Sequence, residues 1–171
     1  MVAIAVFQGG SLDNLASTRF GWTWVLVGAF TVQIAIDLFG YDRLARPLAI
    51  FVLTITYVGA AAFMWLNHSL PGMAIAATGM AMNAVVIFAN GAMPVSRWAA
   101  RVAGIGELGE MGVKHEIAGE STVLAPLADV IPIANTSQII SIGDVVLAVG
   151  ISVLVYRRTL GCRERATRVS D

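Results

Sequence analysis

Four long stretches of this chain carry almost no charge, and no other feature constrains its fold as strongly. They cover residues 22–40, 47–66, 69–89 and 139–156. The second and third contain no charged residue, the first contains only Asp37, and the fourth contains only Asp144. A helix that crosses the hydrocarbon core of a bilayer needs about 20 mostly apolar residues. The pattern therefore predicts an all-α fold, a polytopic bundle of four transmembrane helices.

The composition supports a membrane protein. Of the 171 residues, 57% are hydrophobic and 13% are charged, whereas soluble domains have about 45–50% and about 25%. The 11 basic and 11 acidic side chains cancel, which argues against a partner bound through nucleic-acid phosphates. The single cysteine, Cys162, excludes an internal disulfide framework and a cysteine-rich zinc site. We expect one membrane domain over residues 1–171, with the lipid bilayer as its principal partner.

Two further apolar segments are too short to span a bilayer. Residues 1–7 precede Gln8 and two glycines, and they form either an interfacial stub or the end of a longer first helix. The second segment, residues 123–134, contains Pro126 and Pro132. Because two prolines make a continuous helix costly, we expect this segment to be re-entrant or to lie at the interface.

Residues 91–138 form the one long connection, and one helix is expected within it. Ser96 is a suitable helix start, and Trp98, Val102 and Ile105 follow at helical spacing. The spacing is compatible with an amphipathic helix at the membrane interface, and equally with an ordinary packed helix.

Lys and Arg residues set the expected orientation. Alternating spans place Arg19 and five C-terminal arginines on one side, and Lys114 with four other arginines on the opposite side. The five C-terminal arginines lie in residues 157–171, directly after the last span. Because short segments rich in Lys and Arg stay in the cytoplasm, we expect this tail and both termini to be cytoplasmic.

Several polar residues interrupt the apolar stretches, and their spacing places them on shared helix faces. Gln33 and Asp37 are four residues apart in the first stretch. Asn83 and Asn90 are two helical turns apart in the third, on the same stripe as the small residues Ala76 and Gly79. Small residues allow close approach of a second helix, so we expect this stripe to contact a neighbouring helix.

We expect these polar residues to gather toward one membrane face. With alternating spans, the first and third stretches end on the side of the membrane where the fourth stretch begins. The long connection belongs to the same face. The candidate binding residues are Gln33, Asp37, Asn83, Asn90, Lys114, His115, Asp129 and Asp144. In particular, we expect Asp144 to lie within hydrogen-bonding reach of Asn83, Asn90, Lys114 or His115. The alternative is that the amides only bridge helices, at roughly 0.6–2 kcal/mol per hydrogen bond.

The sequence shows no recognisable catalytic or metal-binding motif. His115-Glu116 begins like the helix of a zinc protease, but no second histidine follows four residues later. The other histidine, His68, is expected on the opposite face, so no metal site is predicted, and no cofactor can be assigned.

Six short motifs follow one another along the chain in an order that is typical of a known family. They are residues 8–12 (QGGSL), Asn83, residues 90–95 (NGAMPV), 114–115 (KH), 127–129 (LAD) and 141–144 (SIGD). Over nearly the whole chain, this set resembles a family of small bacterial integral membrane proteins that is known only as a domain of unknown function. The resemblance implies a multi-pass protein of the bacterial plasma membrane. Family members usually have arginines near Gly9 and Gly91 that this chain lacks, and their first helix is longer.

Three functions are compatible with these observations. The first is a small module that binds or transports a cation, a proton or the head group of an amphiphile at the polar end of the bundle. There Asp37, Asp129 and Asp144 would supply charge, the asparagines neutral ligands, and Lys114 or His115 a gate. The second is an accessory subunit of a larger membrane complex, or a homo-oligomer. The third, less expected, is an enzyme that acts on a lipid head group, with Asp and His as acid and base.

Overall fold

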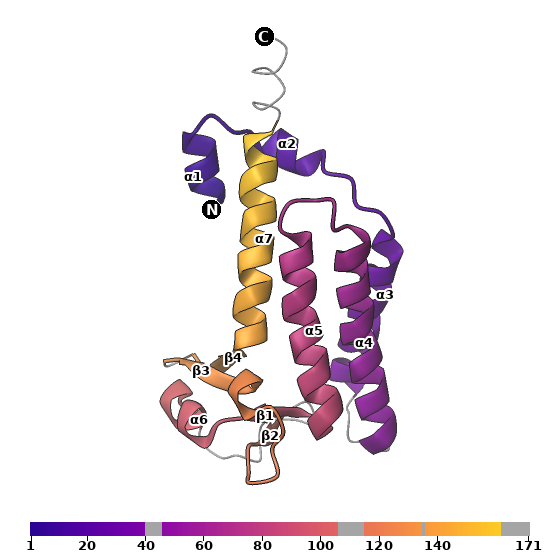
Figure 1. Ribbon diagram of the computed structural model, residues 1–171, viewed down its shortest axis with the longest axis vertical. Coiled ribbons are helices and arrows are strands. Elements are labelled where there is room, and N and C mark those ends of the chain that lie inside the picture. The colour runs from indigo at the N-terminus through magenta and orange to yellow at the C-terminus, as the bar shows by residue number, and fades with distance from the viewer. Residues whose placement is uncertain (40–45, 106–114, 135, 162–171) are drawn as a thin grey trace.

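The computed structural model describes residues 1–39, 46–105, 115–134 and 136–161, and it describes only the backbone at residues 33, 36–39, 46 and 49. Four long helices pack side by side: α3 (Thr23–Phe39), α4 (Arg46–Leu66), α5 (Met73–Asn90) and α7 (Ile142–Leu160). Helix α5 lies between α4 and α7, and α3 packs against α4, behind it in the view of Figure 1. Two short helices, α1 (Val2–Phe7) and α2 (Leu12–Ala16), pack against α7. They lie at the end of the helical layer where α7 ends.

The opposite end of the helical layer carries a four-stranded mixed sheet. The strands are β1 (Met93–Val95), β2 (His115–Ile117), β3 (Asp129–Ile133) and β4 (Gln138–Ser141), in the order β2-β1-β3-β4. Strand β1 is parallel to β2 and β3, whereas β3 and β4 are antiparallel. Helix α6 (Arg97–Ala103) packs on β3, and the short 3-10 helix η3 (Ala125–Leu127) precedes that strand (Figure 1).

The predicted fold class, an all-α bundle of four spans, is wrong. The long connection, expected to be re-entrant or interfacial, contributes the strands of a sheet, and its proline segment forms η3 and β3. Within the described residues, α5 alone has the length and composition needed to cross a membrane, with a mean hydropathy of 1.6. The apolar parts of α3 and α4 are shorter, Thr23–Val32 and Ile50–Leu66, and α7 includes Asp144, Arg157 and Arg158.

Local chemistry explains where the helices differ from the expected apolar stretches. Helix α5 starts at Met73, after the turn that contains Pro71 and Gly72, because Gly72 has a left-handed backbone (φ +84°). Helix α7 starts three residues later than expected because Ser141 caps it, and it continues through Arg157 and Arg158. Basic side chains in the last helical turn interact favourably with the helix dipole, so these arginines do not end the helix.

Helices α5 and α7 approach so closely that their backbones touch at glycines. A Cβ atom added to Gly79 would lie 2.5 Å from the carbonyl oxygen of Gly143 and 2.5 Å from the backbone nitrogen of Leu147. A Cβ atom added to Gly150 would overlap the backbone of Ala76 in the same way. Ala76 and Gly79 are completely or nearly completely buried. The expectation that this stripe contacts another helix is therefore confirmed, and the neighbour is α7.

Candidate functional site

The hydrogen bonds of the site centre on Ser141, which is the last residue of β4 and the N-cap of α7. Its hydroxyl accepts a hydrogen bond from the backbone N–H of Asp144 (3.0 Å), and its own backbone N–H donates to Oδ2 of Asp144 (2.9 Å). This reciprocal pair is a capping box. The helix start therefore fixes the Asp144 carboxylate at the junction between the sheet and the helical layer.

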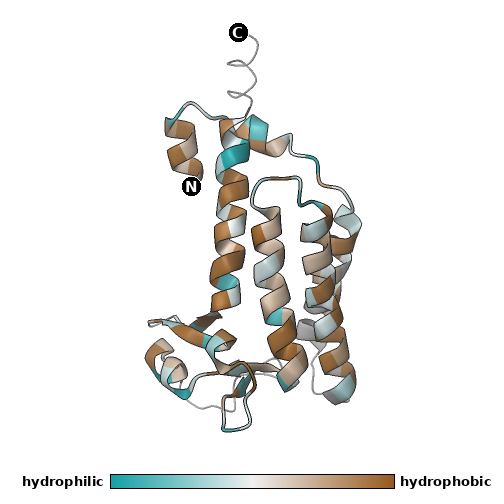
Figure 2. Ribbon diagram, viewed as in Figure 1, coloured by the Kyte–Doolittle hydropathy of each residue, from teal (hydrophilic) through white to brown (hydrophobic). Residues whose placement is uncertain are grey.

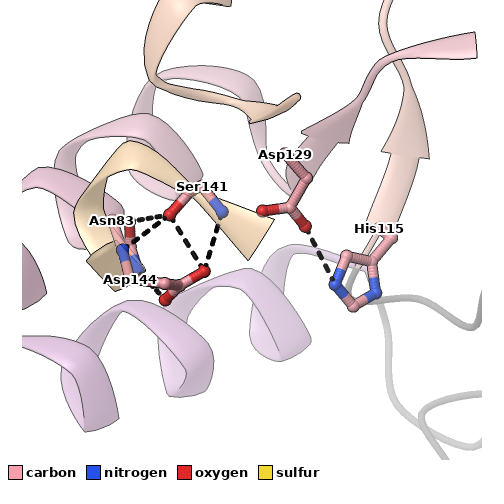
Figure 3. Close-up of polar contacts among 5 residues, drawn as sticks. All are labelled: Asn83, His115, Asp129, Ser141 and Asp144. Carbon is pink, nitrogen blue, oxygen red and sulfur yellow. Dashed lines mark hydrogen bonds and ion pairs between the residues drawn. The ribbon is translucent and has the colours of Figure 1, made fainter. Parts of the chain in front are cut away.

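Asn83 of α5 bonds to both Ser141 and Asp144, so the three residues form a closed ring of hydrogen bonds, called the ring below. Its Nδ2 donates to Oδ1 of Asp144 (2.7 Å), and its Oδ1 lies 2.9 Å from the hydroxyl of Ser141, which can donate to it (Figure 3). Asn83 is 2% exposed and Ser141 is fully buried. The ring fits because residue 143 is a glycine: a Cβ atom there would overlap the Asn83 amide. The predicted contact of Asp144 is thus confirmed, with Asn83 as the partner.

Asp129 brings a second carboxylate to the same junction. It is the first residue of β3 and the register partner of Ser141 in β4, and it is 4% exposed. Its Oδ2 lies 3.5 Å from Nε2 of His115, the first residue of β2 (Figure 3). Burial, and secondly the negative charge of Asp144, raise the pKa of Asp129 to about 7. This carboxyl group therefore exchanges its proton near neutral pH.

A cavity of about 210 Å³ adjoins the ring on the side of the helical layer. Most of its wall is apolar, and Asn83 and Asp144 are its polar residues from α5 and α7. The lining consists of Ala29, Phe30, Thr56, Tyr57, Ala60, Met80, Asn83, Asp144 and Leu147, which come from α3, α4, α5 and α7. The site is therefore a carboxylate held by hydrogen bonds at the wall of an otherwise largely apolar chamber.

Asn90 lies in a different environment from Asn83 and bonds to backbone groups. Its Nδ2 donates to the carbonyl oxygens of Val86 and Val123, and its Oδ1 accepts from the backbone N–H of Val123. These bonds join the end of α5 to the segment that leads into η3. With its amide committed to backbone groups, Asn90 serves as a brace for that segment.

The remaining predicted site residues are Gln33, Asp37, Lys114 and His115. Lys114 lies outside the described residues, as do the side chains of Gln33 and Asp37. His115 contacts Asp129. The site prediction omitted Ser141, although Ser141 and Asp144 have the S-x-x-D spacing of a capping box. That spacing, directly before an apolar run, is the sequence signal that could have identified Ser141 as a partner of Asp144.

The comparisons with known proteins place the chain in a family but not in a functional class. A model of a family of unknown function, DUF5317, matches residues 17–156, so the chain belongs to that family. The match covers every described residue of the ring, of the Asp129–His115 pair and of the cavity lining. Searches of curated proteins and of solved structures found no match.

Proposed function

We propose that this is a membrane protein that binds the positively charged head group of a small amphiphile in the cavity beside Asp144. The observation that carries the proposal is the position of the Asp144 carboxylate, which the Asn83 amide and the backbone N–H of Ser141 fix by hydrogen bonds at the wall of a largely apolar cavity. A carboxylate in an apolar surrounding is strongly stabilised by a cation. The ligand therefore needs both a positive charge and an apolar body.

The acceptor capacity of Asp144 supports binding of an ammonium group. Each carboxylate oxygen can accept two hydrogen bonds. Oδ2 lies near both donors of Ser141, whereas among the described residues Asn83 is the one donor bonded to Oδ1. Oδ1 thus has capacity for a ligand N–H. Within the described part of the chain, no Lys or Arg forms an ion pair with Asp144.

The remaining wall of the cavity suits a hydrocarbon segment rather than a hydrated metal ion. Phe30, Met80 and Leu147 supply apolar surface, and the aromatic rings of Phe30 and Tyr57 can also attract a cation. Hard metal ions such as Ca²⁺ require about six to eight oxygen ligands. An alkylammonium group needs far fewer, so it fits this donor set better.

The surface of the helical layer supports a bilayer location, with α5 as the helix that crosses it. Figure 2 shows apolar residues along α4, α5 and α7. Many large apolar side chains on these helices and on α3 are exposed, and patches of this kind mark contact with lipid or protein. They include Trp24, Val27, Phe51, Ile55, Trp65, Val85, Phe88, Val145, Val149 and Ile151.

The test compares two probes of similar shape that differ in charge, hexylammonium and 1-hexanol. The protein is purified in a mild neutral detergent, and binding is measured by isothermal titration calorimetry. We expect the wild type to prefer hexylammonium by at least about tenfold, equivalent to about 1.4 kcal/mol. Asp144→Asn should lose that preference, because it keeps the shape of the side chain and removes the charge.

Asp13→Asn is the matched control, since Asp13 is an exposed aspartate in the first turn of α2, at the other end of the molecule. It should leave the preference unchanged. Equal affinity of the wild type for both probes, or an undiminished preference in Asp144→Asn, would overturn the proposal.

A further inference from the structure

We propose that Asp129 is a proton-releasing partner of the Asp144 cavity: a cation that binds beside Asp144 expels a proton from Asp129, which leaves through His115 to the solvent. This inference rests on the proposed function and specifies how occupancy of the site is regulated. It gives a role to the buried carboxyl group that does not line the cavity.

The backbone geometry places the two carboxylates on either side of Ser141. Asp129 is paired with Ser141 across the β3–β4 ladder, and Asp144 is bonded to both the backbone and the hydroxyl of Ser141. Two carboxylates in such proximity repel each other when both are ionised. One negative charge on Asp144 therefore favours the protonated form of Asp129, and neutralising Asp144 removes that effect.

Among the described residues, few charged groups other than Asp144 and His115 lie near Asp129. From β2, His115 contacts Asp129, and the neighbouring Glu116 is exposed. Helix α6 packs on β3 through buried alanines, Ala99, Ala100 and Ala103, while its arginines, Arg97 and Arg101, are exposed to solvent. Strand β4 and η3 contribute no titratable side chain, and α7 contributes Asp144.

His115 provides the route for the proton. Its side chain is 41% exposed, whereas that of Asp129 is 5% exposed, so the imidazole bridges the buried carboxyl group and the solvent. The O–H bond of protonated Asp129 breaks, the proton is taken up at Nε2 of His115, and it passes from the imidazole to water. One positive charge enters the cavity and one leaves, so the net charge of the site is preserved.

The direction of the pH dependence follows from this exchange. The pKa of Asp129 is raised to about 7, so Asp129 is mostly protonated below that pH, and a cation that binds beside Asp144 favours loss of that proton. By linkage, cation affinity should fall with decreasing pH, by up to about tenfold per pH unit below the pKa. Above about pH 8 Asp129 is already ionised, and the affinity should reach a plateau.

The first experiment counts the protons released when hexylammonium binds to the detergent-solubilised protein. Calorimetric titrations at about pH 6, in buffers of different ionisation enthalpy, should show release of a fraction of a proton per bound probe, because burial continues to hold the pKa of Asp129 above its usual range. At about pH 8.5 they should show none. Asp129→Asn should bind hexylammonium without releasing protons at either pH. Glu120→Gln, which changes an exposed carboxylate in the loop between β2 and η3, should behave like the wild type.

A second measurement keeps this inference separate from the proposed function, because it uses no ligand. The titration of Asp129 is followed by NMR of ¹³C-labelled carboxyl groups in the wild type and in Asp144→Asn. We expect a lower pKa of Asp129 in Asp144→Asn, since one repelling charge is gone. An unchanged pKa, or hexylammonium binding at pH 6 without proton release, would overturn the inference. Failure of hexylammonium to bind would instead overturn the proposed function.

Discussion

At the scale of single residues, Ser141 connects three parts of the molecule. It ends a strand, caps a helix and bonds to Asn83 of a second helix. The hydrogen bonds that Ser141 makes in these roles involve buried polar groups. Leaving one such group without a partner costs about 1–3 kcal/mol. The orientation of Asp144 is therefore coupled to the packing of α5 and to the register of β4.

Asp129→Asn should change how stability depends on pH. A carboxyl group whose pKa is raised on folding binds more protons in the native state than in the unfolded state. The native state is therefore favoured at low pH, and this contribution is lost as the pH rises from about 4 to about 7. A shift of about three pKa units corresponds to up to about 4 kcal/mol. Thermal melts between about pH 5 and pH 8 should show this decline in the wild type.

Asp129→Asn removes the titrating group, so its melting temperature should vary less over the same range and exceed that of the wild type at pH 8. Glu120→Gln serves again as the control with an unchanged profile. A wild-type melting temperature that rises between pH 5 and pH 8, with the same rise in Asp129→Asn, would contradict the burial argument.

At the scale of elements, the close contact of α5 with α7 determines where the ring forms. Gly79 and Gly143 remove the side chains that would separate the helices, and Asn83 follows Gly79 by one helical turn. The short distance between backbones is what lets a small amide reach Asp144 directly.

Gly79→Ala should destabilise the protein by about 1–3 kcal/mol, because the new methyl group would press on the backbone of α7. Gly59→Ala in α4 is the matched control, since a Cβ atom there meets nothing within 4 Å. That variant should be neutral or more stable by up to about 1 kcal/mol through helix propensity. Chemical or thermal unfolding in detergent compares the two, and equal stability would show that the helices separate without cost.

The sequence predicted the elements unequally, for physical reasons. The apolar stripe with Ala76 and Gly79 and the helix start at Ser96 were predicted because periodicity and capping are local properties. The sheet was missed because β1 and β2 have three residues each, too few for an alternating pattern to stand out. Their stability comes from partners far along the chain, which a local pattern does not reveal.

The candidate site was predictable in part for the same reason. Asp144 and Asn83 were selected as polar residues within apolar stretches, and they are bonded to each other. The proximity of His115 to Asp129 depends on β2 and β3 lying on either side of β1. No spacing in the sequence encodes that neighbourhood. Asn90, selected on the same stripe as Asn83, instead braces the segment at Val123.

At the scale of the whole molecule, the two ends differ in character. One end carries the sheet and the Asp129–His115 pair, and the other carries α1, α2 and the last turn of α7 with its two arginines (Figure 1). If α5 crosses a bilayer, these ends face different compartments. The arginines at the end of α7 favour the cytoplasm for that end, so we expect the sheet on the outer side.

Cysteine labelling in intact cells tests this orientation. In a Cys162→Ser background, Ser121→Cys on the sheet side should react with a membrane-impermeant maleimide. Ser17→Cys, at the end of α2, should react only after the membrane is permeabilised. Both positions are exposed, so access to the reagent is the variable. The reverse pattern would place the sheet in the cytoplasm.

The arrangement of the strands also has a consequence for biosynthesis. Strand β1 follows α5 almost immediately, but its neighbours β2 and β3 are made about 20 and about 35 residues later, and β4 follows only just before α7. Long-range pairing of this kind is slow compared with helix formation. The peptide groups of β1 therefore emerge from the ribosome well before their partners exist. A nascent chain that stalls before residue 138 would lack β4 and would therefore leave open the edge of β3 that pairs with it.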